Sequence, residues 1–285
     1  MRLSGVRSVS GTLVKSMIVE PLGIIADVHG NALALEAVLR DARTRGVSRF
    51  VDLGDTLYGP LQPLDAFQVF QDVPLVAAVA GNQDRKIFQA SRGDLASNRI
   101  LARVVNILGV APIAWLRALP PTATIGDQIF LCHGTPESDT TYLLEDVSSG
   151  RPVVRPESQI KELLGGVRLP VVLCGHSHIP RVVQLSNGQL IVNPGSVGLP
   201  AYDDDQPVKH YMETYSPHAA YAVLEKSLAG WGVALHRVAY NWKEAARQAR
   251  SLGAEDWAQG ISTGRMDPPS GSRMDADLRE QPLIP

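Results

Sequence analysis

The sequence predicts an α/β fold, and three observations carry that prediction. Short apolar, β-prone runs alternate along the chain with segments of helical spacing. Polar residues follow most of the apolar runs, which is where ligands bind in open α/β sheets. With 285 residues, 45% of them hydrophobic, the chain can bury a substantial core in one large domain. The alternation favours βαβ units and a sheet packed on both faces.

The first part of the chain contains three predicted strands, and each ends in polar residues. The apolar run 18–26 is followed by Asp27, the run 49–55 ends on Asp55, and residues 73–84 end in GNQD. Helical spacing of Leu and Ala predicts a helix over 31–46, and 63–71 reads as a shorter helix. The polar tips of these strands are therefore expected to converge at one edge of the sheet.

The later part of the chain reads as an insertion followed by hairpins. Residues 95–119 have helical character between sheet strands, and an Asn-Gly pair inside 181–198 is a strong hairpin signal. The remaining predicted elements are a hairpin over 122–134, a strand over 169–178, a hairpin over 220–240 and a closing helix over 241–252.

Both ends of the chain are predicted to lie outside the domain. Residues 1–16 carry basic residues among serines and no apolar core, so a disordered extension is expected rather than a secretory signal. Met17 directly precedes the first predicted strand, so a start of translation at Met17 is an alternative to a start at Met1. Residues 253–285 are predicted to be a disordered tail because the composition shifts to Gly, Pro, Ser, Asp and Arg. The domain is therefore expected at 17–252.

Composition excludes several classes of protein. A net charge of -2 and a pI near 6.4 argue against extended nucleic-acid binding, although a small phosphorylated substrate is allowed. No run approaches the roughly 18 apolar residues of a membrane span, so no membrane partner is expected. Cys132 and Cys174 each lie in an apolar run and are expected to be buried thiols of a cytoplasmic protein. The sequence is compatible with a homo-oligomer.

Five polar motifs follow the strands in order. They are Asp27-Val28-His29, Gly54-Asp55, Gly81-Asn82-Gln83-Asp84, His133-Gly134 and Gly175-His176-Ser177-His178. Each motif alone is weak, but the ordered set D-x-H, GD, GN, H and GHxH resembles the calcineurin-like metallophosphoesterases over roughly residues 22–200. DVHGN, LYGP, GNQD and NPGSVGLP are together similar to the small prokaryotic branch of phosphodiesterases and phosphatases within that superfamily.

The residue types in these motifs suit divalent transition metals. Carboxylate, imidazole and amide oxygen are ligands for Mn, Fe, Zn, Co or Ni, and thiolate is absent from the set. Four of the seven histidines lie in the motifs. Glycines beside the ligands let the backbone turn sharply, so that short side chains reach inward.

The resemblance implies a two-sheet αββα sandwich with the active site at the carboxyl ends of the strands. It assigns one metal to Asp27, His29, Asp55 and His178 and the second to Asp55, Asn82, His133 and His176, with Asp55 bridging. Two ions so placed imply phosphoester hydrolysis with a metal-bound hydroxide as the nucleophile. The catalytic candidates are Asp55, Asn82, Gln83 and Asp84.

Gln83 departs from the family pattern. Many relatives have a histidine that can assist the leaving group at this position, whereas an amide cannot donate a proton to it. Asp84 is expected to play a structural or orienting role. The missing acid favours substrates with good leaving groups, such as phosphoanhydrides, activated diesters or cyclic diesters.

Four further residues are candidates for contacts to substrate. Asn31 and Tyr58 are placed near the motifs, with a turn-forming or packing role as the alternative for each. His210 and His218 lie in a predicted long loop over 201–221, from which either could enter the site, with a solvated surface position as the alternative. The acidic run Asp203-Asp204-Asp205 in the same loop is expected to be solvated. Asn193, Pro194 and Gly195 are expected to form a tight turn that supports the GHSH loop.

The function predicted from these observations is a dinuclear-metal hydrolase of small phosphodiesters or nucleotide polyphosphates. A phosphomonoesterase or protein serine/threonine phosphatase is an alternative, weakened because GDTLYGP and GNQDRK lack the arginines of protein phosphatases and leave Arg85 out of register. A non-catalytic scaffold of the same fold is a second alternative, which the complete ligand set opposes. A nucleotide-binding module is set aside because no strand is followed by its glycine-rich motif.

Overall fold

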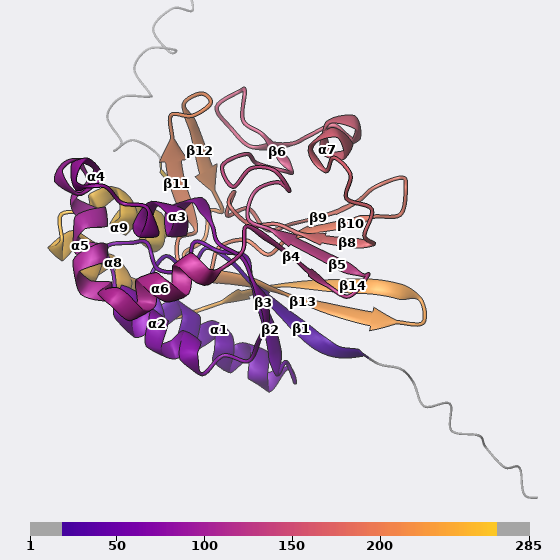
Figure 1. Cartoon of the computed structure of the whole chain (residues 1–285), viewed down its shortest axis with the longest axis horizontal. Helices are drawn as coiled ribbons and strands as arrows, with labels where there is room; N and C mark the ends of the chain where they lie inside the picture. Colours follow the sequence, from indigo (N-terminus) through magenta and orange to yellow (C-terminus); the bar gives the residue numbers. More distant parts are fainter. Residues whose placement is uncertain (1–18, 267–285) are drawn as a thin grey trace, which may run out of the picture.

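The computed structural model describes residues 19–266 (Figure 1). The predicted extension over 1–16, the start at Met17 and the part of the predicted tail after residue 266 lie outside the described residues.

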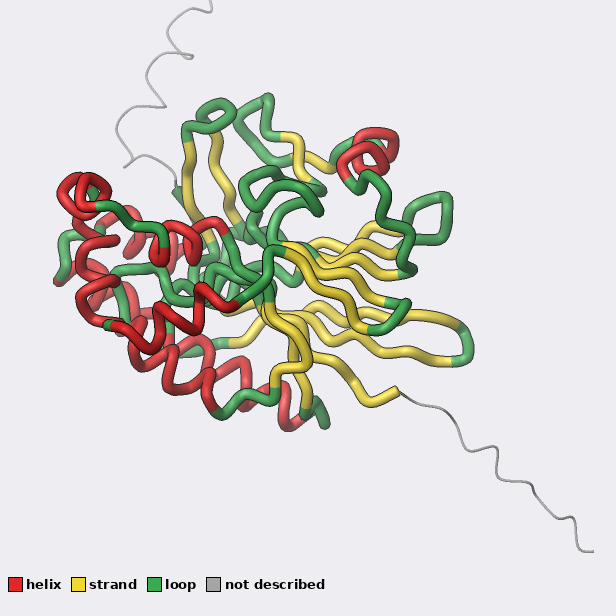
Figure 2. The backbone as a smooth tube through the Cα atoms, in the orientation of Figure 1, coloured by secondary structure: helices red, strands yellow, loops and turns green. Residues whose placement is uncertain are grey.

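Two five-stranded sheets lie face to face (Figure 2). The first has the order β14-β13-β1-β2-β3, in which β1, β2 and β3 are parallel and β13 runs antiparallel to β1. The second has the order β4-β5-β8-β10-β9, with β5, β8 and β10 parallel. The strands of the first sheet are β1 (Val19–Ile25), β2 (Arg49–Asp52), β3 (Leu75–Ala78), β13 (Ala219–Ser227) and β14 (Gly230–Val238), and those of the second are β4 (Thr122–Ile125), β5 (Ile129–Cys132), β8 (Val171–Leu173), β9 (Arg181–Gln184) and β10 (Leu190–Asn193).

Helices cover the outer faces of both sheets. α1 packs on the first sheet through Leu35 and Val38, which share a core with Phe50 and Tyr221. α7 packs on the second sheet through Ile160. The helices are α1 (Ala32–Thr44), α2 (Pro63–Gln71), α3 (Asn82–Phe88), α4 (Arg92–Ser97), α5 (Arg99–Leu108), α6 (Val110–Ala118), α7 (Glu157–Leu163), α8 (Trp242–Ser251) and α9 (Glu255–Thr263). The predicted αββα sandwich is therefore confirmed.

Apolar side chains between the two sheets hold the layers together. Ile24 and Val51 from the first sheet meet Leu131, Leu173 and Val192 from the second, and all are buried. Burying each such side chain stabilises the fold by about 1.5–3 kcal/mol relative to exposing it. Because the sheets are locked in this way, the carboxyl ends of their parallel strands are held in a fixed mutual position.

Two expectations about the later part of the chain are wrong. The predicted loop over 201–221 contains a hairpin of β11 (Ala201–Asp204) and β12 (His210–Glu213). The predicted tail over 253–285 contains helix α9. Helix α9 buries Ala258 and Ile261, so packing rather than composition decides its structure. A further two-stranded sheet joins β6 (Glu145–Asp146) to β7 (Val153–Val154).

Two smaller expectations can be compared with the structure directly. Cys132 and Cys174 are buried free thiols, as expected, and burial raises the pKa of Cys132 to about 12. Among residues 19–266 no single helix is long and apolar enough to cross a bilayer, and α5 and α6 reach that length only as a pair bent by 103°.

Candidate metal centre

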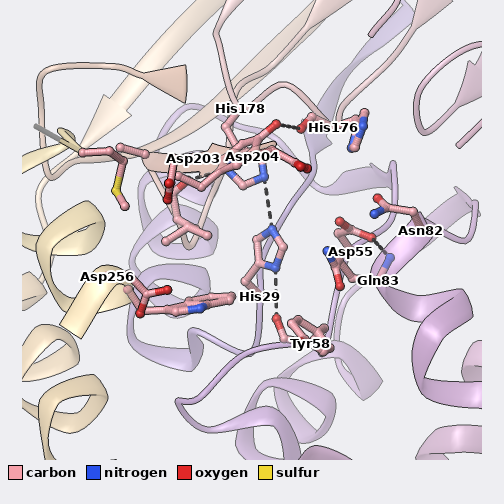
Figure 3. Close-up of a pocket in the computed structure, with 15 residues that line it drawn as sticks. His29, Asp55, Tyr58, Asn82, Gln83, His176, His178, Asp203, Asp204 and Asp256 are labelled. Carbon is pink, nitrogen blue, oxygen red and sulfur yellow. Dashed lines mark hydrogen bonds between the residues drawn. The ribbon is translucent and has the colours of Figure 1, made fainter. Parts of the chain in front are cut away.

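Each of the five motifs follows the carboxyl end of a strand. Asp27 and His29 follow β1, Asp55 follows β2, and Asn82 begins α3 just after β3. From the other sheet, His133 follows β5, and His176 and His178 follow β8. The motifs therefore converge at the carboxyl ends of the parallel strands of both sheets, as the sequence predicts. Figure 3 shows several of these residues around one cavity.

The backbone at the candidate ligands adopts an uncommon conformation. Five of them have positive φ: Asp27 (55°), His29 (51°), Asp55 (56°), His176 (68°) and His178 (60°). This left-handed region costs a side-chain-bearing residue about 1–2 kcal/mol, although Asp, Asn and His tolerate it better than most. The surrounding packing maintains the strain, and each chain segment turns sharply at its ligand.

Glycine is required at one contact in this region. A Cβ atom on Gly81 would lie 2.1 Å from Oδ1 of Asp55 and 2.6 Å from its backbone nitrogen. The glycine of the GN motif therefore makes room for the carboxylate of the GD motif.

The candidate ligands form two groups. Asp27, His29 and His178 bring one potential ligand atom each within 4.8 Å of one another, and Asp55, His133 and His176 do the same. Nε2 of His133 lies 3.1 Å from Oδ1 of Asn82, which adds the amide to the second group. With Asn82, the second group contains every residue of its predicted ligand set, whereas the first group contains its predicted set except for Asp55.

The tautomers of three histidines identify which nitrogen faces the site. Nδ1 of His29 lies 3.0 Å from the carbonyl oxygen of Tyr58, Nδ1 of His178 lies 2.6 Å from that of Leu199, and Nδ1 of His133 lies 2.7 Å from that of Leu53. A carbonyl oxygen can only accept, so each Nδ1 carries a proton. In the neutral ring, Nε2 is then a free lone pair that can bind a metal.

These lone pairs face other acceptors. Nε2 of His29 lies 3.1 Å from Nε2 of His178, and the latter lies 3.3 Å from Oδ1 of Asp27. Oδ1 of Asp27 is buried without a hydrogen-bond partner. Buried acceptors that meet without a proton between them repel one another and are left unsatisfied. A cation resolves this arrangement, so the residues present fit a pair of divalent metal ions.

Charge and burial keep most of these ligands in the form that binds metal. Burial, followed by the charge of His178, lowers the pKa of His29 to about 4, and burial, followed by the charge of His133, lowers that of His176 to about 4. Although burial opposes it, the charge of Asp55 raises the pKa of His133 to about 10. A proton on His133 balances Asp55 in the metal-free protein, and metal binding must displace it.

Asp84 connects the GD and GN loops. Its Oδ2 accepts from the backbone N–H groups of Asp55 (2.7 Å) and Gly81 (3.0 Å), and its Oδ1 accepts from that of Thr56 (3.0 Å). Burial, followed by the charge of Asp55, raises its pKa to about 8, while these N–H groups favour the anion. This geometry agrees with the expected orienting role.

Gln83 lies at the edge of the site. Its backbone N–H donates to Oδ1 of Asp55 at 2.7 Å, which fixes the orientation of that carboxylate. Its side chain lines the cavity, and its Oε1 has no hydrogen-bond partner. The side chain therefore borders the space in which a ligand would bind.

The structure does not bring all four substrate-contact candidates together. Tyr58 lines the cavity, but Asn31 is only 1% exposed. The side chain of Asn31 caps α1 at Ala34 N and donates to the carbonyl oxygen of Gly198 and to the hydroxyl of Tyr240, which is the turn-forming alternative.

The two loop histidines lie away from the cavity. His210 is buried in β12, and its ring nitrogens contact the carbonyl oxygen of Val208 and the hydroxyl of Tyr142. His218 lies edge-on to Trp242. Neither lines the cavity, so the expectation that one enters the site is wrong.

Two tyrosines that lie outside the sequence motifs hold the GHSH histidines in place. The ring of Tyr142 stacks on His176 with 4.7 Å between centroids, and Tyr202 lies edge-on to His178 at 4.5 Å. The Tyr202 hydroxyl lies 2.9 Å from both the Tyr142 hydroxyl and the carbonyl oxygen of His176. No local pattern in the sequence marks either tyrosine, because each reaches the site through a distant segment.

The turn after β10 supports the same loop from below. The side-chain amide of Asn193 donates to the carbonyl oxygen of Gly175 at 2.7 Å, and its Oδ1 accepts from Gly195 N at 2.9 Å. The predicted supporting turn is therefore confirmed.

A cavity of about 210 Å³ opens above the ligands. Its floor consists of candidate ligands together with Tyr58 and Gln83. Its outer wall, which the sequence motifs do not predict, consists of residues from β11, from α9 and from the segment just after α9: Tyr202, Asp203, Asp204, Asp256, Trp257 and Met266. Asp203, Asp204 and Asp256 lie on the side away from Asn82 and Gln83 (Figure 3). Asp203 and Asp204 are exposed as expected, but they also face this cavity.

Comparisons with known proteins agree with this geometry. A metallophosphoesterase of Sphaerobacter thermophilus superposes with a TM-score of 0.66 at 25% identity, covering 86% of this chain and 99% of that one. An uncharacterized protein of Methanocaldococcus jannaschii is 25% identical over 219 residues, which are 66% of this chain and 79% of that protein. A phosphoesterase from E. coli (TM-score 0.40, 20% identity) covers 77% of this chain and 100% of its own, a resemblance too distant to inform function.

A match between the sequence and the pattern of one family establishes the family of this chain. The pattern of the calcineurin-like phosphoesterase superfamily domain matches residues 21–214, which include all of the candidate ligands. The chain therefore belongs to the calcineurin-like phosphoesterase superfamily.

Proposed function

We propose that this protein is a two-metal phosphodiesterase that hydrolyses small phosphodiesters with good leaving groups. The observation that carries the proposal is the convergence of buried carboxylate and imidazole ligands in two groups at the carboxyl ends of the strands. When bound, two divalent ions would supply a water-derived nucleophile at neutral pH and neutralise charge on the reacting phosphate. Asp27, His29 and His178 would hold one ion, Asn82, His133 and His176 the other, and Asp55 would contact both.

The protein's own groups would orient the substrate. Asp84 fixes the backbone of the GD and GN loops, and the backbone N–H of Gln83 fixes Asp55. The Gln83 side chain lines the cavity and would contact the phosphodiester through the N–H groups of its amide. An amide can donate a hydrogen bond to a phosphate oxygen but gives no proton to a departing alkoxide.

The choice of leaving group depends on the residues that line the cavity. Every histidine among the described lining residues belongs to a candidate ligand set, because His210 and His218 lie elsewhere. With no histidine to act as a general acid, the leaving group must depart as a stable anion. This supports activated or cyclic esters over alkyl monoesters.

The choice of a diester over a polyphosphate depends on charge. No Lys or Arg is among the described lining residues, whereas the outer wall adds three carboxylates. A polyphosphate or a dianionic monoester has no cation there to bind beyond the two metals, and the wall repels it. A phosphodiester carries only one negative charge.

The alternatives fit these residues less well. Arg85 forms a bidentate pair with Asp139, at 2.6 and 2.9 Å, so it does not serve to hold a phosphoryl group as protein phosphatases require. A non-catalytic scaffold has no need of a complete pair of ligand groups at a cavity floor.

The test is hydrolysis of bis(p-nitrophenyl) phosphate, p-nitrophenyl phosphate and ATP in manganese by the wild type and Asp55→Asn. We expect diester turnover that exceeds monoester and ATP turnover and that disappears in the variant. Faster hydrolysis of the monoester or of ATP would contradict the substrate class. Activity that survives in Asp55→Asn would contradict the assignment of the site.

A further inference from the structure

The outer wall of the cavity is acidic, and the cations among residues 19–266 neutralise only part of it. Lys209 pairs with Asp203 and with Asp205 at 3.1 Å, which balances that part of the β11–β12 hairpin. No cation in the described part of the chain pairs with Asp204 or Asp256. The wall therefore presents two uncompensated carboxylates to the space above the floor.

One aromatic ring of this wall lies against the floor. Trp257 packs edge-on against His29 with 5.5 Å between centroids and lies 6.3 Å from Tyr58. Asp256, the residue before Trp257 in the chain, lines the same cavity and is exposed. A ligand that spans floor and wall thus passes an indole ring in a negative field.

The wall carboxylates do not form a third metal site. Among the described residues, the two groups of ligand atoms close enough to hold an ion belong to the floor, and Asp203, Asp204 and Asp256 belong to neither group. Dispersed carboxylates beside an aromatic ring are suited instead to a bulky organic cation, which is attracted by both.

We propose that the substrate is a phosphodiester in which one alcohol carries an ammonium group, a proposal that rests on the proposed phosphodiesterase activity. The phosphate lies on the floor, and the ammonium group lies against Asp204, Asp256 and Trp257. A neutral aromatic alcohol would contact Trp257 but leave the two carboxylates without a partner. Hydrolysis adds the oxygen of one water to phosphorus and breaks the P–O bond to the other, activated alcohol, which leaves as its anion, while the protons of that water pass to solvent.

A matched pair of chromogenic diesters tests the proposal. p-Nitrophenyl phosphorylcholine and p-nitrophenyl 3,3-dimethylbutyl phosphate differ by a charged nitrogen in place of a carbon, and both release p-nitrophenolate. We expect kcat/KM to favour the choline ester by about 10-fold in wild type, mainly through KM. The preference should weaken with added salt, because the wall carboxylates are exposed.

Substitutions in the wall assign the preference to these residues. We expect Asp204→Asn/Asp256→Asn to reduce the ratio to about 1, and Asp205→Asn, an exposed acid of the same hairpin that does not line the cavity, to retain it. Equal turnover of the two esters by the wild type, or a preference that survives the double substitution, would overturn the proposal.

A binding measurement separates this proposal from the activity on which it rests. Choline and 3,3-dimethylbutanol are titrated into the metal-free protein and followed by NMR, since the wall needs no metal. We expect choline to bind more tightly than the alcohol and the double variant to lose the difference. No diester hydrolysis combined with selective choline binding would refute the phosphodiesterase and retain the cation site, whereas diester hydrolysis with equal binding would do the reverse.

Discussion

The floor and the outer wall of the cavity differ in how they are built. The floor comes from strand ends of two locked sheets, and backbone groups fix three of its histidine rings and the carboxylate of Asp84. The wall comes from a hairpin and a helix near the end of the described chain, and its acidic side chains are exposed. Under the proposed function, the floor determines the reaction and the wall determines which ester reaches it. Substitutions in the floor should therefore affect every substrate, and those outside it should affect few or none.

The largest effect is expected from Gly81→Ala. The added Cβ would lie 2.1 Å from Oδ1 of Asp55, and a carboxylate displaced by about 1 Å can cost 100-fold in rate. We expect at least that loss of diesterase activity together with weaker metal binding, measured by kinetics and manganese titration. Gly166→Ala is the control, because nothing lies within 4 Å of its Cβ. Equal activity of the two variants would show that the two loops do not fix each other.

Asp84→Asn should have the next largest effect. The carboxylate accepts from three backbone N–H groups, and an amide would point its own donors at one or two of them. We expect a 10- to 100-fold loss of kcat/KM for all esters alike and a lower melting temperature. Asp127→Asn, an exposed acid, should change neither. A loss confined to one substrate would place Asp84 in recognition instead.

Gln83→His tests the leaving-group argument. A histidine here would supply the proton donor that the cavity otherwise lacks, so monoester turnover should rise relative to diester turnover, by about 10-fold or more. Metal binding should stay unchanged, since the contact of residue 83 with Asp55 comes from the backbone N–H. Parallel assays with p-nitrophenyl phosphate and its diester give the ratio. An unchanged ratio would mean that the charge of the wall, rather than the missing acid, determines the preference.

The smallest effect is expected from His218→Ala. This residue packs against Trp242 and does not line the cavity, so kcat/KM should change by less than about twofold for every ester. A larger loss would extend the functional surface beyond floor and wall.

The floor is predictable from the sequence because its signal is local. Each ligand comes directly after an apolar strand, and short polar side chains such as Asp27 and His29 accommodate the left-handed backbone that such a turn needs. The residue types and their order therefore carry the site, together with the topology of parallel strands. The bridging Asp55 and the orienting Asp84 belong to the same motifs.

The wall is not predictable because its structure depends on distant contacts. Helix α9 contains Gly260, a poor helix former, yet a Cβ there would lie 2.3 Å from the carbonyl oxygen of Ala201. Close packing between α9 and β11 thus overrides local propensity, and it places Trp257 beside His29. His210 fails as a prediction for a related reason, since the hairpin buries it against Tyr142.

The most direct test of the account is a titration of metal-free protein with manganese in which bound metal and diesterase activity are measured on the same samples. The two ligand groups predict that two ions bind per chain and that activity appears with the second. Asp55→Asn should weaken both sites and stay inactive. Full activity with one ion, or an active protein that binds none, would contradict the two-metal centre.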